Sequence, residues 1–165
     1  MSETATKPAG QTGQSGVTRE QLIQGLQDDL SREYKAIIQY VIYSQKLDHA
    51  QFMDIATELE KHARQELDHA LRIAKQLDYF GAYPTHEPKP VEVSEDSEQM
   101  LWFDLRAEDE TVRNYRERIR QAESLGEYGL AEELREIIRN EQEHQLDLAT
   151  ALGVIADPDK RQTNT

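Results

Sequence analysis

The sequence predicts an all-α protein: a four-helix bundle made of two repeated helical hairpins that a long proline-rich crossover joins. Three observations predict this fold. Apolar residues recur at helical spacing in four long stretches, a proline-dense segment separates the first two stretches from the last two, and the two halves match when residue 33 is placed on 108 and residue 66 on 141, a shift of 75. Two long helices, an extended linker and two more long helices are the element order of a four-helix bundle with one long crossover.

The first half of the chain contains two expected helices. The first begins at Thr18, whose side chain can cap the helix while Gln21 reaches back, the pattern of a capping box. Asp48 offers the break before the second helix, and Gly81 marks its end because glycine tolerates the left-handed conformation that closes helices. The apolar stripes predicted to face the core are Leu22, Leu26, Leu30, Ile37, Val41 and Leu47, and then Phe52, Ile55, Leu59, Leu67, Leu71 and Leu77.

The crossover and the second hairpin follow. Residues 81–93 read GAYPTHEPKPVEV, and their three prolines exclude a helix, so this segment is expected to be extended. Ser94 is the expected cap of a third helix that runs to about residue 124. Glycines within 126–129 mark the next turn, and the fourth helix is expected to end near Gly153.

Length, charge and cysteine content limit the class of protein. The chain has 165 residues, a net charge of −13 and no cysteine. The expected organisation is a disordered tail over residues 1–16, one bundle domain over 17–154 and a short flexible tail over 155–165. The absence of cysteine excludes disulfides and thiolate metal sites. The acidic balance argues against a nucleic-acid partner, no stretch is apolar enough to span a membrane, and the first residues lack the apolar run of a secretory signal. The expected location is therefore the cytoplasm.

Both halves carry the same acidic and histidine pattern. Glu-x-x-His occurs at Glu66 with His69 and again at Glu141 with His144, and the 75-residue shift also places Glu33 on Glu108. Within one helix, residues i and i+3 lie on the same face. In each hairpin the two glutamates lie at equal distances from the turn, so the common helical rise places them at the same height. The spacing predicts that four carboxylates and two imidazoles meet in the middle of the bundle.

Such a cluster is costly without metal ions. Buried carboxylates repel one another until some of them take up protons. Two divalent cations would balance the four negative charges, and carboxylate with imidazole suits iron, manganese or zinc. We therefore expect Glu33, Glu66, His69, Glu108, Glu141 and His144 to be metal ligands.

These six residues match the ligand set of the ferritin-like superfamily, and the chain resembles bacterioferritins most. The strings REYKAIIQY, MLWFDLRAEDETVRNYRERI and IIRNEQEH around the ligands carry the resemblance. It implies that Glu33 and Glu108 are terminal ligands, that Glu66 and Glu141 bridge the two metals and that His69 and His144 complete one metal each. It also implies that Tyr40, seven residues after Glu33, can supply an electron to the site; an ordinary buried tyrosine is the alternative.

Three departures from bacterioferritin change the expectation. Leu67 stands where that family has its haem-ligating methionine, so no haem is predicted. Lys61 and Gln65 occupy the positions of its inner-surface iron site, which is therefore not matched. Only residues 154–165 follow Gly153, so the short fifth helix of 24-subunit cages is expected to be missing.

The expected function is that of a ferroxidase, which oxidises Fe²⁺ to Fe³⁺ with O₂ or H₂O₂ for iron storage or detoxification. The expected partners are two iron ions, with manganese as the alternative, and a second copy of the chain in a homo-oligomer whose minimal unit is a dimer. Two alternatives remain: a manganese catalase or di-iron oxygenase on the same site, and a non-enzymatic scaffold that metals staple. Four compact helices are expected to leave little room for a substrate pocket. His62, one turn before Glu66, is expected to be a partly exposed residue, with a role beside the ligands or on the path of incoming iron as the alternatives.

Overall fold

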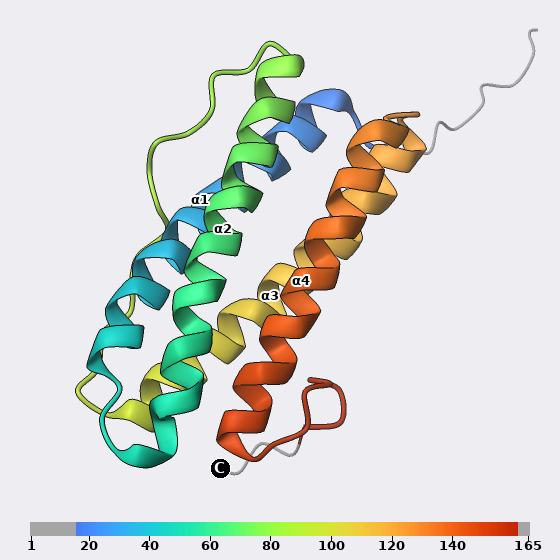
Figure 1. The fold of residues 1–165 in the computed structure, drawn as a ribbon. Helices are drawn as coiled ribbons and strands as arrows, with labels where there is room; N and C mark the ends of the chain where they lie inside the picture. The colour runs from blue at the N-terminus through green and yellow to red at the C-terminus, as the bar shows by residue number, and fades with distance from the viewer. Residues whose placement is uncertain (1–15, 162–165) are drawn as a thin grey trace, which may run out of the picture.

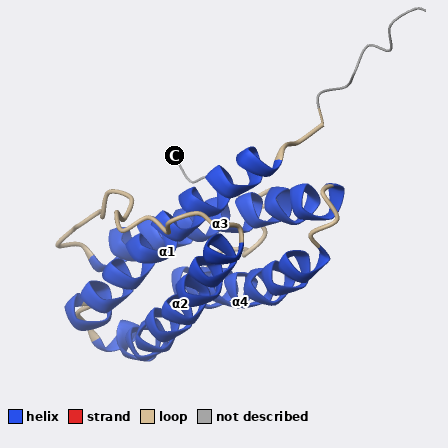
Figure 2. Ribbon diagram, turned by 90° about the horizontal axis from the view of Figure 1, so that it is seen from above, coloured by secondary structure: helices blue, strands red, loops and turns tan. Residues whose placement is uncertain are grey.

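The computed structural model describes residues 16–161, and within them the fold is all-α, as predicted. Helix α1 spans Arg19–Lys46, α2 spans Met53–Tyr79, α3 spans Ser97–Ser124 and α4 spans Tyr128–Leu152. A short 3₁₀ turn, η1 (Ala50–Phe52), precedes α2. Helix α1 packs along α2 and α3 along α4, while α1 also contacts α3 and α2 contacts α4. The bundle therefore has two layers, α1 with α3 and α2 with α4 (Figure 1, Figure 2).

The helix ends follow local chemistry, with two corrections to the predicted caps. Thr18 and Gln21 form the predicted capping box at the start of α1. The predicted cap Asp48 is wrong, because His49, at φ +77°, turns the chain into η1 before α2 begins. The predicted cap Ser94 is also wrong: the Asp96 side chain accepts the backbone N–H of Gln99 at 2.6 Å, a stronger capping interaction.

The crossover lies along α1 rather than standing free of the bundle (Figure 1). The backbone N–H of Lys89 donates to the carbonyl of Ser31 at 2.9 Å, and the backbone N–H of Glu92 donates to the side chain of Gln39 at 3.0 Å. The hydroxyl of Tyr43 donates to the carbonyl of Glu92 at 2.6 Å. These bonds satisfy backbone groups that an extended, proline-containing segment cannot pair with itself.

The core consists of two apolar clusters with a polar layer between them. On every helix, the six expected ligands fall between residues of the first cluster and residues of the second. Three predicted core residues are wrong: Val41, Leu67 and Leu71 are 53%, 52% and 62% exposed. Each directly follows an inward-facing residue, and one step along an α-helix turns a side chain by about 100° away from the preceding one.

The structure describes part of the second expected tail and almost none of the first. The expected disordered tail over 1–16 lies outside the described residues except for Gly16. Of the second tail, residues 155–161 are described, and Arg161 donates to Asp109 of α3 at 2.6 Å and to the carbonyl of Ala156 at 2.6 Å. This part of the tail is tied to the bundle, and flexibility of the tail beyond it stays a prediction. No helix among the described residues is both long and apolar enough to cross a membrane.

Candidate metal centre

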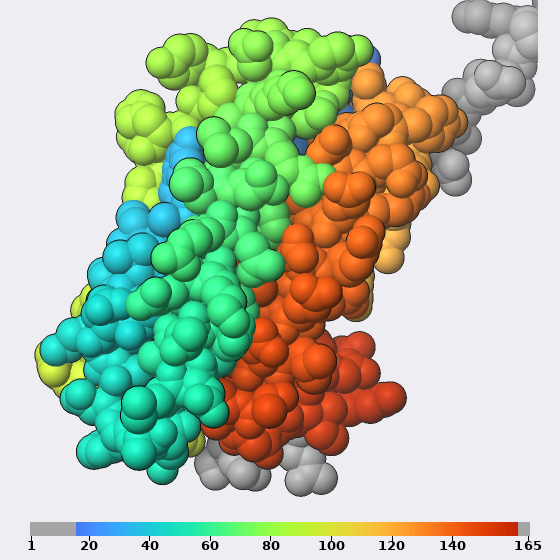
Figure 3. Space-filling view, in the orientation of Figure 1, coloured from blue at the N-terminus to red at the C-terminus, as the bar shows by residue number. Residues whose placement is uncertain are grey.

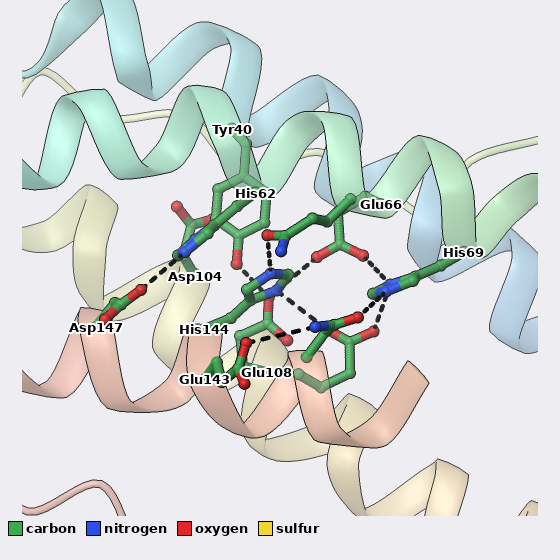
Figure 4. Close-up of polar contacts among 12 residues, drawn as sticks. Tyr40, His62, Glu66, His69, Asp104, Glu108, Glu143, His144 and Asp147 are labelled. Carbon is green, nitrogen blue, oxygen red and sulfur yellow. Dashed lines mark hydrogen bonds and ion pairs between the residues drawn. The ribbon is translucent and has the colours of Figure 1, made fainter. Parts of the chain in front are cut away.

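The structure brings the six side chains together in the polar layer, as their spacing predicted. Figure 4 labels four of them: Glu66, His69, Glu108 and His144. All six are at most 3% exposed. They form two overlapping groups whose potential ligand atoms lie within 4.8 Å of one another. The first group is Glu33, Glu66, His69 and Glu141, and the second is Glu66, Glu108, Glu141 and His144. That these residues bind metal stays a prediction.

The distances around the two histidines are nearly the same in both groups. Nδ1 of His69 lies 2.9 Å from Glu66, 3.0 Å from Glu141 and 3.6 Å from Glu33. Nδ1 of His144 lies 2.9 Å from Glu66, 3.2 Å from Glu141 and 3.7 Å from Glu108. Glu66 and Glu141 are thus close to both imidazoles, whereas Glu33 and Glu108 are each close to one. This arrangement fits two shared and two unshared carboxylates.

Within residues 16–161, several buried atoms of the cluster have no hydrogen-bond partner, and this tests whether the residues suit metal ions. Glu66 Oε1, both carboxylate oxygens of Glu141 and Nδ1 of His144 are buried and unpartnered. Nδ1 of His144 is only 2.9 Å from Glu66 Oε1, yet the two atoms lack the alignment of a hydrogen bond. Lone pairs that converge without pairing are costly in a core. The donor set, oxygen and imidazole nitrogen, fits two divalent transition-metal ions.

The outer nitrogens of both imidazoles face side-chain amides. Nε2 of His144 lies 2.9 Å from Oε1 of Gln65, and Nε2 of His69 lies 3.4 Å from Oδ1 of Asn140. An amide oxygen can only accept, so each Nε2 donates its proton to the amide, and Nδ1 of each ring is the atom that faces the carboxylates. Gln65 and Asn140 each precede a shared glutamate and are related by the 75-residue shift. Sequence reasoning missed this role of Asn140, although the repeat contains the signal.

Two buried tyrosines hold the unshared carboxylates. The hydroxyl of Tyr40, on α1, donates to Glu108 on α3. The hydroxyl of Tyr115, on α3, donates to Glu33 on α1. The two contacts are equivalent under the 75-residue shift, so each hairpin supplies the tyrosine that orients the other's glutamate. Tyr115 was not predicted from the sequence, although the repeat relates it to Tyr40.

Burial and mutual repulsion perturb the pKa values of the cluster. Burial, and then the charges of Glu66 and Glu141, raise the pKa of Glu33 and Glu108 well above 4.5. Burial acts against charging His144, but the surrounding carboxylates, Glu66 foremost, raise its pKa well above 6.5. Without metal, the site therefore retains protons that cations would replace.

His62 differs from its prediction: it is 2% exposed, so the partly exposed position was wrong. Its ring stacks on that of His144 with 4.0 Å between centroids, and its Nε2 lies 3.1 Å from Oδ2 of Asp147 (Figure 4). The helix places His62 one turn from Glu66 on the same inward stripe, and packing of α4 against α2 covers it.

A cavity of about 340 Å³ reaches the cluster from the side of α1, α3 and the crossover. Its inner wall includes Glu33, Tyr40 and Glu108, and its outer wall includes Lys89 and Glu92 of the crossover. The expectation that four compact helices leave little room for a pocket is therefore wrong. The crossover, which lies along α1, supplies the additional wall.

A bundle of two helical hairpins that gathers four carboxylates and two imidazoles in its core has the architecture of the ferritin-like carboxylate proteins. The family model "Ferritin-like domain" matches residues 23–157, and the chain belongs to the ferritin-like domain family. A bacterioferritin of Brucella melitensis biotype 1 is 24% identical over 139 residues, which are 80% of this chain and 86% of that protein. The crystal structure of a ferritin-like, diiron-carboxylate protein from Bacillus anthracis str. Ames matches with a TM-score of 0.77 and 32% identity, over 81% of this chain and 96% of that one.

Proposed function

We propose that the protein is a ferroxidase that binds two Fe²⁺ as substrate at Glu33, Glu66, His69, Glu108, Glu141 and His144. The observation that carries the proposal is the buried cluster with its unpartnered, converging ligand atoms. The Bacillus anthracis relative, described as a diiron-carboxylate protein, supports two iron ions over one. Membership of the ferritin-like family supports iron over the other metals that the same donors accept.

The reaction balances with two electrons. Each Fe²⁺ gives up one electron, O₂ takes the two electrons with two protons to form H₂O₂, and two Fe³⁺ result. With H₂O₂ as oxidant, the two electrons and two protons convert it to two water molecules, and two Fe³⁺ again result. Glu66 and Glu141, close to both imidazoles, would hold the two ions near each other. Carboxylates tolerate both oxidation states of iron because they are hard anionic ligands.

The two tyrosines would orient the unshared carboxylates, and with H₂O₂ as oxidant Tyr40 would supply one of the two electrons in place of one Fe²⁺. Its hydroxyl donates to Glu108, so the phenolic proton would pass to that carboxylate when the ring loses an electron. Burial, followed by the charge of Glu108, raises the pKa of Tyr40 well above 10. The phenol therefore remains protonated until it is oxidised, which couples the two transfers.

The wider physiological role is proposed on the same basis. The protein would store or detoxify iron in the cytoplasm, without haem, as a homo-oligomer whose minimal unit is a dimer. The exposed apolar side chains of Val41, Leu67 and Leu71 on α1 and α2 support an interface between copies of the chain.

The cavity favours a second candidate: a manganese catalase or a di-iron oxygenase on the same site. A volume of about 340 Å³ lies within the range of small-molecule pockets. Peroxide disproportionation by the manganese-loaded protein would support the catalase. A scaffold in which metals only stabilise the fold would show neither peroxide disproportionation nor fast oxidation of Fe²⁺.

The test is stopped-flow absorbance after anaerobic, Fe²⁺-loaded protein is mixed with O₂, titrated in iron per chain. We expect a fast phase that saturates near two irons per chain and that disappears in Glu66→Ala and Glu141→Ala. The matched control is Glu132→Gln, since Glu132 is on α4 and pairs with Arg135 at the surface. No fast phase in the unmodified protein, or full rates in both alanine variants, would refute the proposal.

A further inference from the structure

A second group of possible metal ligands lies beside the six-residue cluster, on the side opposite the cavity. Glu58 and His62 on α2 and Asp147 on α4 place their potential ligand atoms within 4.8 Å of one another. The side chains of Glu58 and Asp147 are 38% and 42% exposed, whereas that of His62 is 3% exposed. The group therefore connects solvent at the α2–α4 face, which is in front in Figure 3, with the interior.

His62 is not satisfied by its protein neighbours. Its Nε2 lies 3.1 Å from Asp147, but its buried Nδ1 has no hydrogen-bond partner in the part of the chain that the structure describes. An imidazole nitrogen that no protein group satisfies is an atom that a metal ion can use as a ligand.

The internal repeat provides a comparison at the other end of the site. The 75-residue shift relates Glu58 to Glu133, His62 to Ile137 and Asp147 to Arg72. There, Arg72 lies 2.6 Å from both Glu133 and Glu136, so an arginine neutralises the carboxylates.

Among the described residues, no arginine pairs with the group around His62. The two carboxylates face the imidazole of His62, and the cation paired with one of them, Glu58, is Lys61, at 2.6 Å and 58% exposed. A surface lysine contributes little to holding a carboxylate in place. The fold itself does not require charged ligands at this position, because the equivalent position is filled by isoleucine and an ion pair.

The position of His62 links this group to the main cluster. Its ring lies directly against the ring of His144, with an angle of 28° between the two planes. A cation held by His62 and Asp147 would be one imidazole ring away from a ligand of the proposed dinuclear site. The net charge of −13 would draw cations to such a surface opening.

We propose that Glu58, His62 and Asp147 form a third, mononuclear site for a divalent cation, through which Fe²⁺ passes between solvent and the dinuclear centre. Binding of a cation at this site stands on its own residues, whereas the passage of Fe²⁺ rests on the proposed ferroxidase function. One carboxylate–imidazole–carboxylate set with exposed carboxylates suits a site that binds and releases, because water can complete and replace its ligands.

The test uses Co²⁺, which oxygen does not turn over, with the full-length protein. Crystals soaked in Co²⁺ are measured for anomalous density, and equilibrium dialysis gives the number of ions per chain. The variants are His62→Ile, which copies the residue at the equivalent position, and Asp147→Asn. The control is Glu133→Gln, at the position equivalent to Glu58.

We expect three ions per chain in the unmodified protein and in Glu133→Gln, with one density peak among Glu58, His62 and Asp147, and two ions per chain in both variants. No peak at this position at saturating Co²⁺, or a peak that both variants retain, would overturn the inference. A peak here without density at the six-residue cluster would support the third site and refute the proposed ferroxidase.

The passage of iron is tested by the rate at which Fe²⁺ added to the metal-free protein becomes available for fast oxidation. His62→Ile should slow this loading by about 10-fold, the lower end of the effect of removing a residue that supports a metal site, without changing the amplitude of the fast phase. Loading at the rate of the unmodified protein would overturn the passage role.

Discussion

The substitution Glu141→Gln probes the shared position of this carboxylate most directly. Glu141 belongs to both halves of the cluster, whereas Glu33 belongs to one. Glutamine has the shape of glutamate, so the bundle should remain folded while one ligand charge is lost. Bound metal should therefore stabilise Glu141→Gln less than it stabilises Glu33→Gln, the equivalent change at an unshared carboxylate.

The magnitude follows from binding linkage. At a free metal concentration of 100 times Kd, each bound ion adds about 2.7 kcal/mol of stability, so two ions add about 5 kcal/mol. For a domain of this length, each kcal/mol raises Tm by about 2–4 °C, which predicts a rise of roughly 10–20 °C for the unmodified protein. If the loss of a ligand charge weakens binding about 100-fold, the upper end for metal-site partners, each affected ion contributes only about 0.4 kcal/mol.

Glu141→Gln affects both ions, so the metal-induced rise in Tm should fall to about 2–3 °C. Glu33→Gln affects one ion and should retain roughly 6–12 °C. The assay is thermal unfolding followed by circular dichroism, with and without Mn²⁺, and the control is Glu132→Gln, whose surface pair with Arg135 is not part of the site. Equal losses in the Glu33 and Glu141 variants, or an undiminished rise in Glu141→Gln, would refute the assignment of shared and unshared carboxylates.

Three further predictions concern the groups around the cluster. Tyr40→Phe should slow iron oxidation, measured by stopped-flow absorbance, severalfold without abolishing it. If orientation of the carboxylate is the cause, Tyr115→Phe should slow iron oxidation too. An effect of Tyr40→Phe alone would point to electron supply by Tyr40. Gln65→Leu should weaken Mn²⁺ binding about 10–100-fold, measured by calorimetry, because it removes the acceptor that holds Nε2–H; unchanged affinity would contradict the role. Burial raises the pKa of Glu33 and Glu108 in the folded state, so as pH rises the unfolded chain releases their protons first. The stability of the metal-free protein should therefore fall as pH rises above about 4.5 toward the raised values, and Mn²⁺ should raise Tm more at pH 8 than at pH 6. A larger rise in Tm at pH 6 would contradict this sign.

Much of the architecture is already encoded by local patterns. The capping box at Thr18 predicted the start of α1 because both of its hydrogen bonds are formed within four residues. The prolines of residues 81–93 predicted the extended crossover because proline excludes a helix whatever its surroundings. The repeated Glu-x-x-His predicted the convergence of six side chains because helical rise and periodicity are constants of the backbone.

Side-chain exposure was predicted less well, because it depends on how the helices pack. Leu67 and Leu71 fit an apolar stripe by spacing, but the inward direction of α2 is set by Glu66 and Ala70 facing α4 and α1. His62 is buried for the same reason: α4 covers the stripe on which it lies. One residue of difference along a helix changes the direction of a side chain by about 100°, and the sequence contains no local signal that resolves it.

The sequence by itself determined the fold class, the two-hairpin repeat and the six candidate ligands, because each depends on spacing along single helices. Only the tertiary structure decided the crossed contacts from Tyr40 to Glu108 and from Tyr115 to Glu33, the cavity walled by the crossover, and the group of His62 with Asp147. Each of these joins different helices, or a helix and the crossover, and such contacts exist only when the packing of the two hairpins sets their rotation and separation.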